Sequence, residues 1–196
     1  MARTPDNPRR KVAALATGLA AIGVAIGSGA DFTAQSANAS TAFVAGTLAI
    51  DNSHEGGSFF DSGHLVPGGP AATGVVDIQN TGRIAGDFTV SRDAYENHDA
   101  GEPAAAPLGE RLELEVLDCG TFDGEDPPRC GDAGDATVYE RGTLARMSEP
   151  IDLGRFEPSE RHRYRFSARL PGSVGNEYQG DHTTAGFVWD AVQADR

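Results

Sequence analysis

Short runs in which apolar and polar residues alternate restrict most of this chain to β structure. In the segment His162–Leu170 every second residue is apolar, namely Tyr164, Phe166, Ala168 and Leu170. Because successive side chains of a strand point to opposite faces, this spacing predicts a strand with one buried face. The other side chains of the run are expected to lie largely toward water or the rim: His162, Arg163, Arg165 and Arg169. The segment Thr183–Gln193 has apolar residues on both faces, which is typical of a central strand.

Further strands are predicted between clusters of Gly, Pro, Asn and Asp. The expected runs are Phe43–Ile50, Val75–Gln79, Gly86–Ser91 and Leu112–Asp118, with shorter ones at Thr137–Arg141 and Ser148–Gly154. The turn signal Asn80-Thr81-Gly82 indicates either a β-hairpin or a connection between two sheets. The segments Tyr95–Gly109 and Gly120–Ala136 are expected to be irregular surface loops. Since no stretch after residue 30 keeps a helical period over a dozen residues, we predict an all-β, jelly-roll-like antiparallel β-sandwich.

The N-terminal 30 residues have the composition of a secretory signal. Three basic residues, Arg9-Arg10-Lys11, precede the run Val12–Ala30, which contains no charged residue and ends in small residues. Cleavage is expected between Ala30 and Asp31, and a second small-x-small exit lies between Ala39 and Ser40. A retained membrane anchor is the alternative, because a run of this length is able to span a bilayer. We therefore divide the chain into a signal peptide (1–30), an N-terminal extension (31–41) and a β-sandwich domain (42–196).

The part that follows the signal is strongly acidic. Residues 1–30 hold four of the 16 basic residues and one of the 29 acidic ones, which leaves 12 basic residues, 28 acidic residues and a net charge of −16. This charge argues against nucleic acid partners and anionic membrane surfaces, because both would be repelled.

Cys119 and Cys130 are the only cysteines. In an exported chain an even number of cysteines favours pairing, and we predict one disulfide that closes a short loop.

The histidines and acidic residues give no clear metal site. His54-Glu55 begins the zinc motif H-E-x-x-H, but Ser58 stands where the second histidine is required, and Gly56-Gly57 disfavours the helix. His64, His98 and His182 are scattered in polar loops and are not expected to be ligands. The acidic residues of the Gly120–Ala136 loop lack the regular spacing of a calcium-binding loop, so a solvated loop is expected and bound calcium is the alternative. No cofactor is predicted.

Nucleophilic catalysis has no support either. The cysteines are expected to be paired, and no serine lies in a G-x-S-x-G turn. The sequence therefore predicts a protein that is not an enzyme.

Four segments, taken in order, resemble the TasA/camelysin family, whose precursors carry a SipW-type signal peptide. Ala30-Asp31-Phe32-Thr33 is similar to the family's signal exit, and Ala42–Ile50 resembles its F-x-A-G-T-L-x-L start. Val76–Gly82 resembles its strand that ends in N-x-G. Asn176–Gly180, followed by Phe187–Gln193, resembles its closing Y-Q-G and F-x-A-x-Q segments.

This resemblance implies a secreted jelly-roll sandwich in an extracellular or biofilm matrix, or on the cell surface. It implies processing by a signal peptidase of SipW type and self-association into fibres, in which an N-terminal segment of one subunit completes the sheet of its neighbour. Such a donor segment would lie in Asp31–Ser40 here. An open sheet edge offers unpaired backbone groups to an extended peptide, which makes this mode of assembly physically reasonable. After cleavage no membrane attachment is expected.

Two other functions stay open at the level of sequence. The family has also been catalogued as a metallopeptidase, so a camelysin-like surface metallopeptidase is one alternative, although the incomplete motif at His54-Glu55 gives it no mechanism. A monomeric surface binding module, stabilised by calcium, is the other.

Overall fold

The computed structural model describes residues 33–36, 47–60, 65–101, 104–132 and 134–194. The chain divides into two units, Met1–Ala30 and Asp31–Arg196, and the fold described below is that of the second. The predicted signal peptide and both predicted cleavage positions, Ala30/Asp31 and Ala39/Ser40, lie outside the described residues. Within the ranges given above, no helix is long and apolar enough to cross a membrane.

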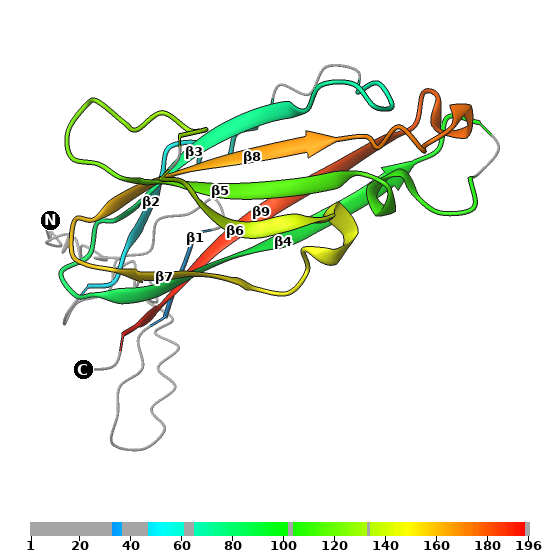
Figure 1. Cartoon of the computed structure of the whole chain (residues 1–196). Helices are drawn as coiled ribbons and strands as arrows, with labels where there is room; N and C mark the ends of the chain where they lie inside the picture. Colours follow the sequence, from blue (N-terminus) through cyan, green and yellow to red (C-terminus); the bar gives the residue numbers. More distant parts are fainter. Residues whose placement is uncertain (1–32, 37–46, 61–64, 102–103, 133, 195–196) are drawn as a thin grey trace, which may run out of the picture. The chain divides into compact units, whose positions relative to one another are not determined.

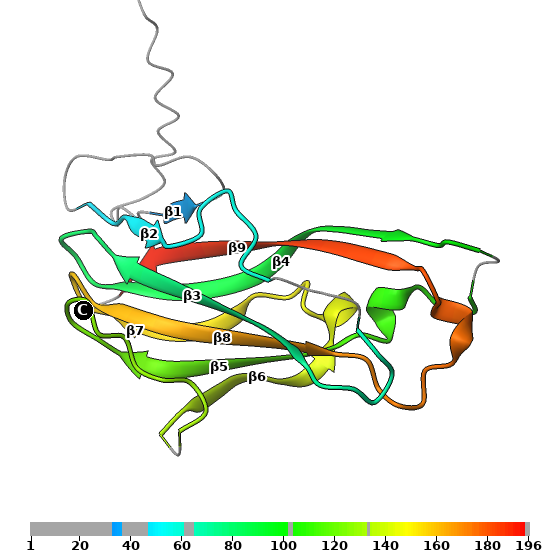
Figure 2. The ribbon, with the colours of Figure 1, turned by 90° about the horizontal axis from the view of Figure 1, so that it is seen from above.

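The second unit consists of two antiparallel β-sheets packed against each other, and Figure 2 shows them as two layers. In the first sheet the strand order is β1 (Thr33–Ser36), β9 (His182–Gln193), β4 (Gly86–His98) and β7 (Ile151–Phe156). In the second sheet it is β2 (Ile50–Asn52), β3 (Ala72–Asn80), β8 (Arg161–Arg169), β5 (Glu113–Thr121) and β6 (Ala136–Thr143). The predicted all-β class is confirmed, whereas the jelly-roll topology stays a prediction.

Most connections carry the chain from one sheet to the other (Figure 1). Among the described strands, only β2 with β3 and β5 with β6 are consecutive and also neighbours. The turn after Asn80 joins β3 to β4 in the opposite sheet, so of the two interpretations of that turn, the connection between sheets is the correct one. The described connections contain three short 3-10 helices: η1 (Leu108–Glu110), η2 (Leu144–Arg146) and η3 (Asn176–Tyr178).

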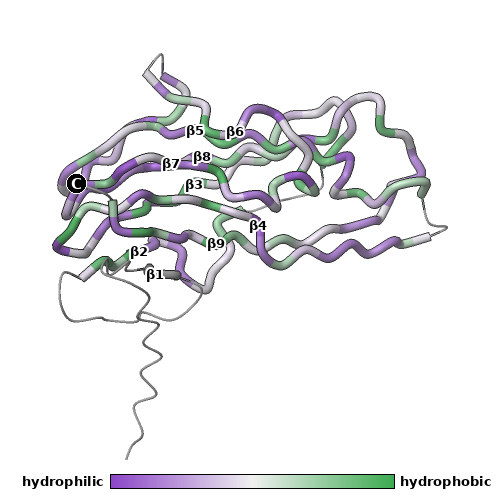
Figure 3. Tube along the Cα trace, turned by 90° about the horizontal axis from the view of Figure 1, so that it is seen from below, coloured by the Kyte–Doolittle hydropathy of each residue, from purple (hydrophilic) through white to green (hydrophobic). Residues whose placement is uncertain are grey.

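The core lies between the sheets and is built from the alternating apolar residues. Figure 3 shows apolar and polar positions alternating along the strands. Trp189 on β9 contacts Tyr164 and Phe166 on β8 across the interface, with ring centroids 5.6 and 6.1 Å apart. All three side chains are buried. The predicted buried face of the β8 run is confirmed, and so is the central position of β9, which pairs with both β1 and β4.

Asn80 is a fully buried polar residue in this core, and it fixes the connection from β3 to β4. Its Nδ2 group donates to the carbonyl oxygens of Ile84 and Phe156 at 2.8 and 3.2 Å. Its Oδ1 atom accepts a hydrogen bond from the backbone N–H of Gly82 at 2.9 Å. One side chain thus replaces water for three backbone groups at the point where the chain changes sheets.

The first predicted strand, Phe43–Ile50, has different bounds in the structure. Residues 47–49 do not form a strand, and β2 begins only at Ile50, while residues 43–46 lie outside the described ranges. The turn formers Asp51 and Asn52 belong to β2 because they pair with Gln79 and Ile78 of β3.

The predicted loop Tyr95–Gly109 is also partly wrong, because β4 continues to His98. A register shift between Arg92 and Tyr95 lets β4 resume its pairing with β9 after an irregularity. The Asn97 side chain then accepts a hydrogen bond from the backbone N–H of Gly109 at 3.0 Å and ties the extended strand to η1. Pairing with β9 thus holds Tyr95–His98 in a strand that their own sequence did not predict.

We expect Asn80→Ala to lower the free energy of unfolding by about 3 kcal/mol, because three backbone groups lose their partner and two of the lost bonds are buried. The exposed neighbour Thr81 gives a matched control, since Thr81→Ala should stay within about 0.5 kcal/mol of the parent. Urea unfolding of both variants measures the difference. Equal effects of the two substitutions would contradict the role given to Asn80.

Candidate assembly edge

β1, one of the two edge strands of the first sheet, comes from the predicted donor segment. β1 runs antiparallel to the C-terminal half of β9, with Thr33 opposite Val192 and Ser36 opposite Trp189. The four consecutive pairs show no register shift. The structure therefore places part of Asp31–Ser40 at the edge of its own sheet, in the conformation that a donor strand would adopt.

β1 covers only part of the β9 edge. β4 pairs with β9 from His182 to Gln193 on one side, whereas β1 reaches only Trp189–Val192 on the other. In the part of the chain that the structure describes, no strand pairs with the remaining side of His182–Val188. An exposed strand edge of this kind is a template for another extended segment.

The other sheet edges are less suited to pairing. β7 contains Gly154 at a φ of 87°, next to a register shift in its pairing with β4. β6 has two register shifts against β5 and exposes Glu140 and Arg141. β2 has only three residues. Beyond β2, the edge of β3 is bridged at Gly74 by Phe60, and beyond β7, the edge of β4 exposes Asp93 and Glu96. Bulges, charges and short strands protect edges against further pairing. The β9 edge, where β1 pairs without a register shift, is therefore the best candidate for assembly, and the shift in the neighbouring β4–β9 pairing lies beside its uncovered part.

An inter-sheet cavity of about 1200 Å³ adjoins the uncovered half of β9. Residues 180–189 line one side of it, and residues 52, 54–60 and 65–67 line another. Its walls are rich in apolar side chains, among them Phe59, Leu65 and Phe187. The Phe59 ring lies 5.6 Å from that of Phe187 and bridges the two layers. The part of β9 that β1 does not cover therefore lies beside an apolar cavity between the sheets.

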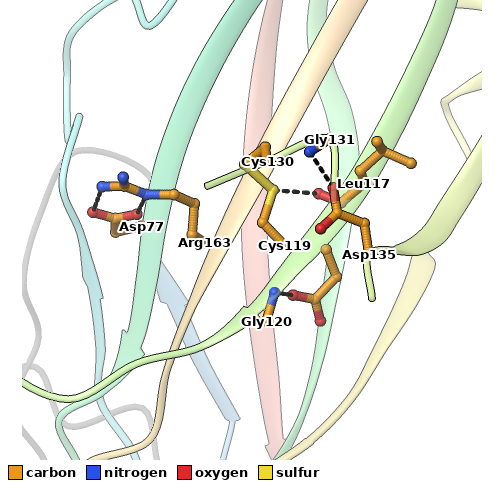
Figure 4. The surroundings of a disulfide bond; sticks show 9 residues. Asp77, Leu117, Cys119, Gly120, Cys130, Gly131, Asp135 and Arg163 are labelled. Carbon is orange, nitrogen blue, oxygen red and sulfur yellow. Dashed lines mark hydrogen bonds and ion pairs between the residues drawn. A yellow bond between two sulfur atoms is a disulfide. The ribbon is translucent and has the colours of Figure 1, made fainter. Parts of the chain in front are cut away.

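The predicted disulfide is present. Cys119 and Cys130 are bonded, with their Cα atoms 4.9 Å apart, and Figure 4 shows the bond beside the Asp77–Arg163 ion pair. The loop that follows Cys119 lies over the outer face of the second sheet, where the guanidinium groups of Arg161 and Arg163 lie 5.4 and 5.6 Å from the centroid of the Phe122 ring. The disulfide and these contacts hold the acidic loop against β8, away from the β9 edge.

His162 forms a charged cluster at the rim of the core. Its Nδ1 atom lies 2.9 Å from Asp118 Oδ2, and its Nε2 atom lies 3.2 Å from Glu160 Oε1. Its ring stacks on that of Phe156, with centroids 4.3 Å apart. The side chain points to the same sheet face as Tyr164 and is only 14% exposed, so the expectation that it lies at the rim is met, but on the core side.

Both ring nitrogens donate to carboxylates only when His162 carries a proton on each. Burial by itself lowers the pKa of His162, but the hydrogen bonds and negative charges of Asp118 and Glu160 raise it above its ordinary value overall. The cluster is therefore a structural ion triad that ties the loop before β8 to β5.

The sequence predictions about metal ligands have mixed outcomes. His54 lies in a turn, as expected, with its Nδ1 atom 3.0 Å from Ser53 Oγ, and His64 lies outside the described residues. Within the described ranges, no group of three His, Cys, Asp or Glu side chains is placed to hold a metal ion. The view that His98 and His182 are scattered is wrong, because they lie directly opposite each other on β4 and β9. They are 84 positions apart in the chain, and only the strand register brings them together.

Comparison with known proteins adds no relative: no family model matches this chain, and a search of curated proteins finds no similar sequence. The resemblance to the TasA/camelysin family therefore stays a prediction that rests on the four segments quoted above.

The raised pKa of His162 predicts a specific pH dependence of stability. Its ion triad should contribute fully below about pH 6.5, the ordinary pKa of histidine, and the contribution should vanish as the pH rises through the higher pKa of the folded protein. We expect the stability difference between the parent and His162→Gln to be larger at pH 6 than at pH 8.5, as measured by urea unfolding.

Asp118→Asn serves as the matched variant, because it removes one carboxylate while keeping His162. In a protein that carries Asp118→Asn, the stability lost on adding His162→Gln should therefore depend less on pH than it does in the parent. A difference between parent and His162→Gln that stays constant from pH 6 to pH 8.5 would show that protonation of His162 does not stabilise the fold.

Proposed function

We propose that this protein is an exported structural protein of an extracellular matrix or cell surface, and that its copies assemble by exchanging β1. In the assembled form, β1 of one copy pairs with β9 of the next. The observation that carries this proposal is the regular, short β1–β9 pairing at an otherwise open edge. Strand exchange keeps the contacts of β1 nearly unchanged, because the β1–β9 pairs that form within one copy form again between two copies.

The length of chain around β1 suits an exchange. Eleven peptide steps separate Ser36 from Thr47, the next described residue, and an extended segment of this length spans up to about 36 Å. β1 itself pairs over only four positions, so little has to be broken before it pairs elsewhere. The uncovered part of β9 and the adjoining apolar cavity offer additional surface to an incoming segment.

Export is supported by the signal-like residues 1–30 and is compatible with the disulfide, because disulfides persist in oxidising compartments. The position of signal cleavage decides whether assembly is possible. Cleavage after Ala30 keeps Thr33–Ser36, whereas cleavage after Ala39 removes it. We propose cleavage after Ala30 by a signal peptidase of SipW type.

The net charge of −16 on residues 31–196 repels copies at long range, so assembly should be faster at physiological salt than at low salt.

The test compares the chain that begins at Asp31 with the chain that begins at Ser40, by negative-stain electron microscopy at the same concentration and salt. We expect fibres from the longer chain alone, because the shorter one lacks β1. Circular dichroism and the presence of the Cys119–Cys130 disulfide check that both are folded.

A control of unchanged length separates the strand from mere chain length. Successive N–H groups of a strand point to opposite sides, so in Ala34→Pro/Gln35→Pro one of the two prolines removes a donor that faces β9. This variant should form no fibres. Fibres from the chain that begins at Ser40 or from the proline variant, or a parent that stays monomeric at high concentration, would refute the exchange of β1.

A further inference from the structure

Two histidines lie opposite each other at the end of the β4–β9 pairing where β4 ends and β9 begins. The register of β4 and β9 ends with His98 opposite His182. Their rings are stacked, with centroids 4.5 Å apart and an angle of 17° between the ring planes. Opposed residues of an antiparallel pair have Cβ atoms about 4.5–5.5 Å apart, so the backbone alone keeps these side chains adjacent.

The pair lies on the solvent face of the sheet. His98, His182 and the two flanking residues of the same face, Glu96 and Thr184, are all exposed. The Glu96 carboxylate lies 3.7 Å from Nε2 of His98. The surroundings are acidic, since Asp99 and Asp181 adjoin the pair in sequence. An ion from solution can therefore reach both rings, and the local charge favours a cation.

The strands are held firmly on both sides of the pair. The Asp181 side chain accepts a hydrogen bond from the backbone N–H of Ala100 at 2.8 Å, and Thr183 Oγ1 donates to the carbonyl oxygen of Glu96 at 3.0 Å. These bonds join β4 and β9 around the two histidines. The two histidines are thus adjacent before any ion arrives and only their rings have to reorient, which lowers the entropy cost of chelation.

We propose that His98 and His182 form a surface site for one divalent transition metal ion of the zinc and copper class. Imidazole nitrogens suit these ions. The rings are 4.5 Å apart but stacked, so each has to turn about its Cβ–Cγ bond before one nitrogen of each can lie at the usual distance of about 2 Å from a shared ion. Two protein ligands leave coordination positions open for water or for a group from another molecule. The site lies at the opposite end of β9 from the β1 pairing, so it does not depend on assembly.

The experiment titrates the purified protein with ZnCl₂ in isothermal calorimetry and records the electron paramagnetic resonance spectrum of added Cu²⁺. We expect one zinc ion per chain, and a copper spectrum with coupling to two imidazole nitrogens. His98→Ala and His182→Ala should each weaken zinc binding at least tenfold and leave coupling to a single imidazole. His54→Ala, which removes an exposed histidine from a turn, should change neither readout.

Both substituted side chains are exposed, so the variants should fold, and circular dichroism checks this. Failure of the parent to bind either ion would overturn the proposal. Unchanged binding in the double variant would also overturn it, because the ion would then be held elsewhere in the chain.

Discussion

The pairing of β9 between β4 and β1 is the interaction on which the rest of this structure depends. β9 carries Trp189 into the interface between the sheets, where it contacts Tyr164 and Phe166 of β8. Its pairing with β4 also orders Tyr95–His98, a segment with no strand pattern of its own, and brings His98 to His182. On the other side, its edge is only partly covered by β1. The core, the candidate metal site and the candidate assembly edge thus all depend on one strand, β9.

The strands that the sequence predicted well are those whose own residues alternate. The predicted runs in β3, β5, β8 and β9 carry apolar residues at every second position, which is the pattern that packing between the two sheets requires. The disulfide could also be predicted, because a chain with two cysteines offers only one pairing. The face of His162 was harder to predict, since a polar side chain on the core side is stable only because Asp118 and Glu160 meet it there.

The parts that local sequence could not predict are those that a partner strand imposes. Thr33–Ser36 has small and polar residues without a large apolar anchor, and its strand conformation comes from the β9 backbone. Asp51 and Asn52 favour turns, yet β3 holds them in a strand. The opposition of His98 and His182 depends on a register shift near Arg92, and no local pattern encodes it. The candidate site is therefore largely a property of strand register.

A cysteine pair across β1 and β9 tests the central claim most directly. Thr33 and Val192 are opposed in the register, and cysteines at such positions are close enough to bond. The chain that begins at Asp31 and carries Thr33→Cys and Val192→Cys is assembled under mild reduction and then oxidised, beside a dilute sample oxidised before assembly. The account predicts covalent oligomers from the fibres and covalently closed monomers from the dilute sample, on a non-reducing gel. Fibres that yield only monomers would contradict it, because β1 would then remain in its own sheet.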